Sequence, residues 1–335
     1  MASPNLTHIS ASLTGYTWRT ARRTDAHAIY QLYAAADLAD HTWWAGTLEE
    51  VHNDFDSPRS DPQRGTLVAV APDGSLAAVG WIFINPEGSQ ELRAFLWGQV
   101  HPKHRMRGLG DRLLHWQEQR AARLLADFAD GRPRKLRAVA LSTQEDRNRL
   151  LQRHGFEAVR NFYRMRRDLR LPLPEKPLPP GVRIVRWSPE LDEAARQASN
   201  EAFQDHWGSE PSTAEDWKLH FAASREFRPD ITALALAGDR VVGVCMCTVR
   251  AEDNARQGIN EGWVNILAVV RAWRGKGLAS ALLMTSMEGF RAAGLETVGL
   301  GVDAENLTGA LRLYESMGFR AVQRTITYFK DASEA

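Results

Sequence analysis

Short apolar runs separated by turn residues occupy the middle of the first half of the chain. Two such runs flank a Pro-Asp-Gly turn in LVAVAPDGSLAAVGWIFI, residues 67–84, and predict a β-hairpin. A further apolar run at 92–100 predicts a third strand, and the amphipathic segment after it predicts a long helix. This pattern indicates an α+β unit in which helices pack on a mostly antiparallel sheet.

The same order of predicted elements returns in the second half. A second hairpin is predicted by ITALALAGDRVVGVCMCTV, residues 231–249, and another apolar strand follows it. The same number of residues separates Gly80 from Gly243 and Gly155 from Gly318. Two copies of one unit of roughly 160 residues explain this spacing.

A proline-rich segment divides the two predicted copies. It is LRLPLPEKPLPPG, residues 169–181, and proline removes backbone donors and restricts the residue before it. An extended linker is therefore expected. We predict an N-terminal domain over 1–170, a linker over 171–181 and a C-terminal domain over 182–332, each with a mixed, mostly antiparallel sheet flanked by helices.

The composition is that of an ordinary globular protein, with 44% hydrophobic and 25% charged residues. The 42 basic and 41 acidic side chains leave a net charge of +1, so neither nucleic acid nor an anionic membrane is expected as a partner. No apolar stretch reaches about 18 residues and no secretory h-region is visible, which predicts a cytoplasmic protein. The two cysteines, Cys245 and Cys247, share one predicted strand, so neither a disulfide framework nor a metal site is expected.

A basic, glycine-containing turn joins a strand to a helix in both copies. The pattern R-x-x-G-x-G/A occurs in HRMRGLG, residues 104–110, and in WRGKGLA, residues 273–279. Backbone N–H groups and the positive end of the helix dipole converge at such a turn, which suits a pyrophosphate group. The alternative is a plain connection whose glycines serve only the turn geometry. The Walker lysine and a complete G-x-G-x-x-G are absent, which disfavours nucleoside triphosphates and dinucleotides.

These turns resemble the hallmark motif of the GNAT superfamily of acyl-CoA-dependent N-acyltransferases. In the second half the resemblance extends through NILAVVRAWRGKGLASALL and DAENLTGALRLYESMGF, which hold Asn306 and Tyr314 at the family's spacing. In the first half the turn matches equally well, but Leu151 stands where the second half has Tyr314, and Arg147 stands where it has Ala310. The tandem arrangement is similar to that of the mycothiol synthases, in which the C-terminal copy carries the chemistry.

The resemblance implies acetyl-CoA as co-substrate and no metal. It implies that backbone amides at the end of the central strand hold the acyl end of this molecule, that the turn holds its pyrophosphate, and that an asparagine contacts its pantetheine arm. The corresponding residues are Leu267, Ala268, Val269, Arg274, Gly275, Lys276, Gly277, Leu278, Ala279 and Asn306, with Arg105, Gly108 and Gly110 in the first half. Asparagine also suits a helix N-cap, so a structural role for Asn306 stays open.

Acetyl transfer to an amine needs a proton donor for the departing thiolate. A tyrosine with a pKa of about 10 stays protonated beside a thiol with a pKa of about 8.5, so Tyr314 is the candidate donor. Packing of Tyr314 between helix and sheet is the structural alternative. The family's usual glutamate base is replaced here by Trp263, which leaves three candidate bases: Glu261 acting through water, Asp205 and His206.

These features together predict an acyl-CoA-dependent N-acetyltransferase. The expected reaction is direct transfer of an acetyl group from acetyl-CoA to a primary amine of a small molecule, through a tetrahedral intermediate, in the C-terminal domain. The N-terminal domain is expected to be catalytically degenerate because it lacks the tyrosine. The alternatives are a non-catalytic acyl-CoA-binding or sensing protein and a protein or peptide N-acetyltransferase. A tyrosine kept in one copy only favours turnover over simple binding.

Overall fold

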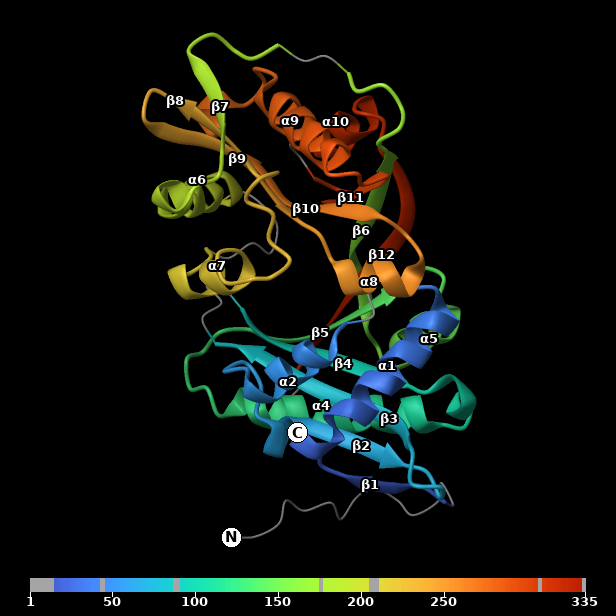
Figure 1. The fold of residues 1–335 in the computed structure, drawn as a ribbon. Helices are drawn as coiled ribbons and strands as arrows, with labels where there is room; N and C mark the ends of the chain where they lie inside the picture. The colour runs from blue at the N-terminus through green and yellow to red at the C-terminus, as the bar shows by residue number, and fades with distance from the viewer. Residues whose placement is uncertain are drawn as a thin grey trace. The chain divides into compact units, whose positions relative to one another are not determined.

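The chain forms two compact units, which we call unit 1 (Met1–Arg160 with Thr325–Ala335) and unit 2 (Asn161–Arg324). Figure 1 shows that each unit has a sheet with helices packed on it. The predicted α+β class, with two copies of a mostly antiparallel sheet, is therefore confirmed. The structure is a computed structural model, and it describes residues 15–42, 46–86, 91–174, 177–204, 211–306 and 309–332.

The sheet of unit 1 is antiparallel except where β4 and β5 run parallel. Its strands, in spatial order, are β1 (Thr17–Arg19), β2 (Thr66–Val70), β3 (Leu76–Asn85), β4 (Leu92–Val100), β5 (Arg134–Leu141) and β12 (Arg320–Asp331). Its helices are α1 (Ala26–Asp40), α2 (Leu48–Asp56), α3 (Pro62–Gly65), α4 (Leu109–Ala126) and α5 (Glu145–Arg153). Helices α1 and α2 cover one face of the sheet and α4 covers the other (Figure 1).

Unit 2 repeats this order, and here β10 and β11 are the parallel pair. Its strands, in spatial order, are β6 (Glu157–Asp168), β11 (Thr297–Asp303), β10 (Glu261–Val269), β9 (Arg240–Thr248), β8 (Ala233–Ala237) and β7 (Val182–Arg186). Its helices are α6 (Asp192–Phe203), α7 (Ala214–His220), α8 (Ala251–Gln257), α9 (Leu278–Ala292) and α10 (Ala310–Ser316). Helices α6 and α9 lie on opposite sides of the sheet (Figure 1).

The strand that ends each half of the chain pairs within the other half's unit. Strand β6 pairs with β11, with Asp168 opposite Thr297, and β12 pairs with β5, with Thr325 opposite Leu141. The unit boundaries therefore fall inside β6 and β12, and the proline-rich segment 171–181 lies within unit 2. The predicted division into 1–170 and 182–332 differs from these units because it followed chain order, whereas strand pairing joins segments that are distant in sequence.

The repeated glycines let a helix approach the sheet closely. A Cβ atom on Gly243 would lie 2.9 Å from a methyl group of Leu282 in α9, and one on Gly80 would lie 2.7 Å from a methyl group of Leu113 in α4. Each leucine side chain would have to move to admit such a Cβ atom, so glycine at these positions lets the helix pack without displacing it. The equal spacing of these two glycines in the sequence thus matches similar helix packing in both units.

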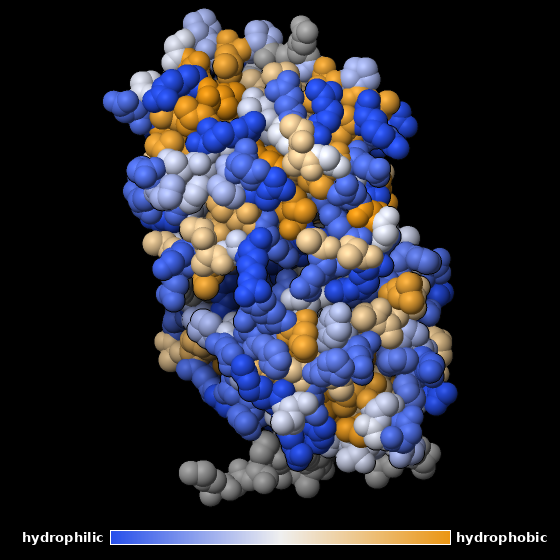
Figure 2. Space-filling model, viewed as in Figure 1, coloured by the Kyte–Doolittle hydropathy of each residue, from blue (hydrophilic) through white to orange (hydrophobic). Residues whose placement is uncertain are grey.

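The surface carries mixed chemistry. On the face shown in Figure 2, hydrophilic residues predominate and apolar residues form separate groups. Among the helices that the structure describes, none is both long and apolar enough to cross a membrane.

Candidate active site

Strands β10 and β11 are paired only at their beginnings. Their parallel register ends where Val264 faces Leu300, although β10 continues to Val269. A β-bulge in the ladder between β9 and β10 lies at the same place, between Val264 and Ile266. A split therefore opens between β10 and β11 beside the last residues of β10.

Backbone amides of β10 point into this split. The amide of Val270 donates to the carbonyl of Val242 at 3.0 Å, on the β9 side. Hydrogen-bonded positions alternate along an antiparallel pair, so Ala268 also faces β9, whereas the amides of Leu267 and Val269 face the split. The arrangement offers two donors to a polar group lying there.

The turn after β10 is shaped to receive an anion. Gly275 and Gly277 adopt left-handed conformations, with φ of +73° and +80°, and an added Cβ at either position would meet nothing within 4 Å. Gly277 is the N-cap of α9 and provides no side-chain cap, so the first amides of the helix keep no partner within the helix. Free amides at a helix start beside open space form a suitable cradle for a pyrophosphate. We call this turn, residues 274–279, the unit 2 cradle.

The two basic side chains of the cradle differ in role. Arg274 donates through Nε to the carbonyl of Val269 at 3.1 Å and through Nη2 to the carbonyl of Ala202 in α6 at 2.6 Å. Its guanidinium therefore braces the turn against the sheet and the first helix of the unit. The ammonium of Lys276 lies 4.8 Å from the centre of the Trp273 ring, at the start of α9. Of the two, Lys276 is the better placed to add charge for a ligand.

Tyr314 of α10 lies in the core of unit 2. Its side chain is buried, and its ring meets that of Phe319 edge-on at 6.0 Å. Burial raises the pKa of the Tyr314 hydroxyl, and the thiol of Cys245 adds to this effect. Cys245, whose thiol acts on Tyr314, faces Leu267 across the ladder between β9 and β10. The hydroxyl stays protonated at neutral pH and can donate a hydrogen bond.

Glu261, a candidate base, lies in a buried ion-pair cluster at the start of β10. Its carboxylate pairs with Arg164 and Arg166 of β6, and Thr297 donates to it at 3.3 Å. Only 5% of its side chain is exposed. Gly299 makes the cluster possible, because a Cβ there would lie 3.2 Å from a carboxylate oxygen of Glu261 and 2.6 Å from the Trp263 ring. These contacts favour a structural role for Glu261.

The remaining candidates are placed less directly. Asn306 lies in the turn after β11. The N-cap of α10 is Gly309, so Asn306 does not cap this helix. Asp205 and His206 lie outside the described residues. No group of three or more potential metal-ligating side chains occurs among the residues whose positions are described.

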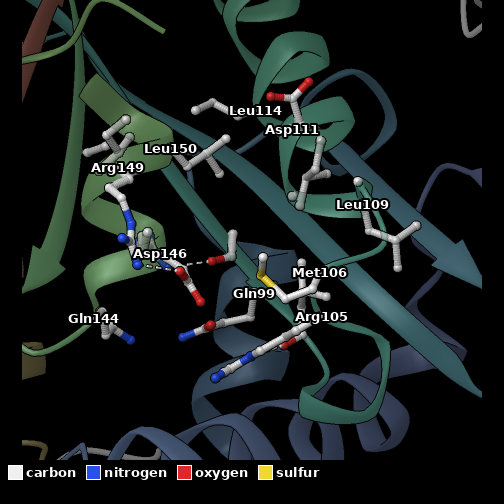
Figure 3. A pocket seen from close by; sticks show the side chains of 18 of the residues that line it. Gln99, Arg105, Met106, Leu109, Asp111, Leu114, Gln144, Asp146, Arg149 and Leu150 are labelled. Carbon is white, nitrogen blue, oxygen red and sulfur yellow. Dashed lines mark hydrogen bonds and ion pairs between the residues drawn. The ribbon is translucent and has the colours of Figure 1, made fainter. Parts of the chain in front are cut away.

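Unit 1 contains a cavity of about 1000 Å³ at the corresponding place. It extends from the end of β4 to the start of α4, where Gly108 is a left-handed N-cap with φ of +77°, and Gly110 lines it. The register between β4 and β5 ends at Phe95 and Arg137, so these strands also separate. Figure 3 shows the side chains of Gln99, Arg105 and Gln144 pointing toward a common part of this cavity.

Arg105 repeats the bracing role of Arg274. It donates to the carbonyl of Val100 at 3.3 Å and forms a bidentate pair, at 2.6 and 2.9 Å, with Asp40 at the end of α1. Met106 has φ of +59° at the position held by Gly275 in unit 2. The turn geometry is therefore kept in unit 1 even where the glycine is lost.

Several residues of both sites were not found from the sequence. Arg164 and Arg166 come from the strand that unit 2 receives from the first half, and Asp40 lies far from Arg105 along the chain. Alternating basic residues in YRMRRD, residues 163–168, were the only visible signal of the first pair. A local sequence pattern does not show which distant segments of the chain will pair.

Known acetyltransferases are similar to this chain in sequence. Residues 193–319 match the family model described as the acetyltransferase (GNAT) family. A mycothiol acetyltransferase of Thermobispora bispora is 37% identical over 66% of this chain and 70% of its own length. A mycothiol acetyltransferase of Parafrankia sp. (strain EAN1pec) is 29% identical over 96% of this chain and 99% of its own length.

Solved structures agree with these sequence relatives. A GCN5-related N-acetyltransferase from Sphaerobacter thermophilus is 30% identical, with a TM-score of 0.75 over 95% of this chain and 96% of that one. A tandem GNAT protein from the clavulanic acid biosynthesis pathway shares the fold, with a TM-score of 0.70 at 15% identity over 96% and 99% of the two chains. The predicted tandem GNAT architecture is confirmed, and the chain belongs to the GNAT family of acyl-CoA-dependent acetyltransferases.

Proposed function

We propose that unit 2 transfers an acetyl group from acetyl-CoA to a primary amine of a small molecule, within the cytoplasm. The observation that carries this proposal is the meeting of three features in one unit: the split beside Leu267 and Val269, the unit 2 cradle, and the buried hydroxyl of Tyr314. Relatives named mycothiol acetyltransferases favour an acceptor of the mycothiol class over a protein or peptide.

In this proposal the cradle holds the pyrophosphate, and Asn306 contacts the pantetheine arm. The amides of Leu267 and Val269 stabilise the oxyanion that forms when the amine nitrogen attacks the thioester carbon. Collapse of the tetrahedral intermediate breaks the C–S bond and leaves an amide and a thiolate. The nitrogen gives its excess proton to water, and the thiolate accepts a hydrogen bond from Tyr314 before it is protonated.

Unit 1 has a different role in the proposal. It keeps the turn with Arg105, Gly108 and Gly110, together with a cavity whose volume suits a large ligand, so we expect it to bind coenzyme A. Leu151 provides no hydroxyl where unit 2 has Tyr314, so we expect no turnover there.

The test is a panel of amines incubated with acetyl-CoA while free thiol is measured. The panel includes amino sugars, polyamines, amino acids and cysteine-containing conjugates, and we expect amine-dependent thiol release with at least one small amine. The Gly277→Val variant serves as the blocked control. An absence of amine-dependent release from the wild-type protein, with acetyl-CoA still bound, would instead support the acyl-CoA-binding alternative.

A further inference from the structure

One guanidinium in unit 1 occupies the place where unit 2 leaves its strand free. Arg147 of α5 donates through Nη1 to the carbonyl of Gly98 in β4 at 2.8 Å. Counted from the turn that follows each strand, Gly98 corresponds to Leu267 in unit 2. Counted from the Gly-Phe pair that follows each helix, Arg147 corresponds to Ala310. Unit 1 therefore has a cation at the acyl end of its cavity, and unit 2 has a methyl group.

Arg147 has donors left over for a ligand. A guanidinium carries five N–H groups, and within the described part of the chain one hydrogen bond, to Gly98, and a ring contact with Trp97 at 6.0 Å involve this side chain. The nearby carboxylate of Asp40 is already held by Arg105 and by Gln144, which donates to it at 2.8 Å. Arg147 itself lines the cavity.

The surroundings of Arg147 favour an anion there. Burial lowers the pKa of its guanidinium to about 10, with Asp40 and Tyr33 opposing the shift and Arg105 adding to it. The side chain thus remains charged at neutral pH but is poorly solvated. Arg147 forms no ion pair at contact distance with a carboxylate among the described residues, and a partly desolvated cation of this kind gains most from a ligand that brings a negative charge to it.

We propose that Arg147 makes the unit 1 cavity selective for free coenzyme A, bound as the thiolate, over acetyl-CoA. This inference rests on the proposal that unit 1 binds coenzyme A. The thiol gives its proton to the solvent on binding, and the resulting sulfur anion lies against the guanidinium. The acetyl group of acetyl-CoA cannot ionise, and it would compete with Arg147 for the space beside Gly98. Unit 1 would then bind coenzyme A, which is a product of the proposed reaction in unit 2.

The expected size of the effect follows from the thiol pKa. A free thiol of this kind has a pKa of about 8.5, and thiols beside cations reach values of about 6. A shift of that size makes coenzyme A bind about tenfold more tightly than acetyl-CoA at pH 7 and releases most of one proton. The affinity for coenzyme A rises with pH between about 6 and 8.5, and the affinity for acetyl-CoA, which has no titrating thiol, stays flat by comparison.

The experiment uses calorimetry on the full-length Gly277→Val protein, in which the unit 2 cradle is blocked. Titrations with coenzyme A and with acetyl-CoA in two buffers of different ionisation enthalpy give affinity and proton release together. His104, Arg105, Asp40, Asp111 and the acidic residues of α5 line the cavity as well, and acetyl-CoA, which meets the same groups, controls for their effects. When Gly108→Val is added to the Gly277→Val protein, proton release on coenzyme A binding should disappear.

Arg147→Ala should abolish both the preference for coenzyme A over acetyl-CoA and the release of a proton on binding. Arg149→Ala is the matched control, because Arg149 lines the same cavity from the same helix but pairs with Glu145 and Asp146 (Figure 3). It should keep both properties.

Three results would overturn the inference. They are equal affinities without proton release, a preference that survives Arg147→Ala, and tighter binding of succinyl-CoA than of coenzyme A, which would make the site one for acyl carboxylates. If unit 1 binds no ligand at all, the inference also fails. Amine-dependent thiol release by the wild-type protein would still support the proposed function of unit 2, so the two failures are distinguishable.

Discussion

The Tyr314 hydroxyl holds its proton more tightly than a tyrosine in water, because burial raises its pKa. Complete proton transfer from such a group to a thiolate whose conjugate acid has a pKa of about 8.5 is uphill by at least ~2 kcal/mol. In the proposed mechanism, Tyr314 therefore contributes a hydrogen bond that strengthens as charge develops on the sulfur. Because the hydroxyl stays protonated at neutral pH, it is not available as the base that accepts the proton of the amine.

Replacing Tyr314 by phenylalanine removes this donor and keeps the ring. We expect kcat to fall by about 10²-fold or more, with little change in acetyl-CoA affinity or melting temperature. Steady-state kinetics on the acceptor found in the amine panel, with calorimetry for acetyl-CoA, measures both. An unchanged kcat under conditions where chemistry limits the rate would show that Tyr314 only packs in the core and does not take part in catalysis.

Glu261 is expected to stabilise unit 2 and not to act as the base. Glu261→Gln leaves the buried Arg164 and the partly exposed Arg166 without their counter-ion, which should cost about 3 kcal/mol of unfolding free energy. Thermal melts compared with the exposed control Glu252→Gln measure this loss. At a temperature where the variant is folded, loss of the acidic limb of the kcat pH profile would instead identify Glu261 as the base.

At the scale of elements, the proposed cofactor site depends on the left-handed cap of α9. Gly277→Val should weaken acetyl-CoA binding by at least tenfold, because the branched side chain fills the open space beside the helix amides and strains a φ of +80°. Gly294 follows the other end of α9 with φ of +82° and equally open surroundings, so Gly294→Val is the matched control for strain alone. Equal losses of affinity in both variants would mean that the cradle does not hold the cofactor.

Local patterns predicted the elements well and their partners less well. The hairpins around residues 67–84 and 231–249, the two turns and the helices after them are each specified within a short window of sequence. The amides at Leu267 and the ion pairs of Glu261 depend on how strands from distant parts of the chain pair. A short window of sequence does not include both of those strands. The hydrogen bond from Arg274 to α6 is of the same kind, because its acceptor Ala202 lies 72 positions earlier in the chain.

At the scale of the whole molecule, the exchanged strands make each half of the chain depend on the other. Tyr328 of β12 is 1% exposed in the core of unit 1, and its hydroxyl donates to Asn148 at 2.8 Å. Met165 of β6 is 1% exposed in the core of unit 2. Each core is thus completed by a residue from the opposite half, so neither half alone contains a complete unit.

This exchange gives a reciprocal prediction. Tyr328→Ala should destabilise unit 1, and Met165→Ala should destabilise unit 2, each by about 3 kcal/mol, because each removes a large side chain from a packed core. Hydrogen exchange read by mass spectrometry should then show faster exchange in β4 and β5 for the first variant and in β9 and β10 for the second. The two positions lie in the halves opposite to the units they are expected to affect, so stability set by chain order would give the reverse pattern. That reversal would show that β6 and β12 pair within their own halves in solution, and faster exchange in both units for both variants would show that the two units unfold as one.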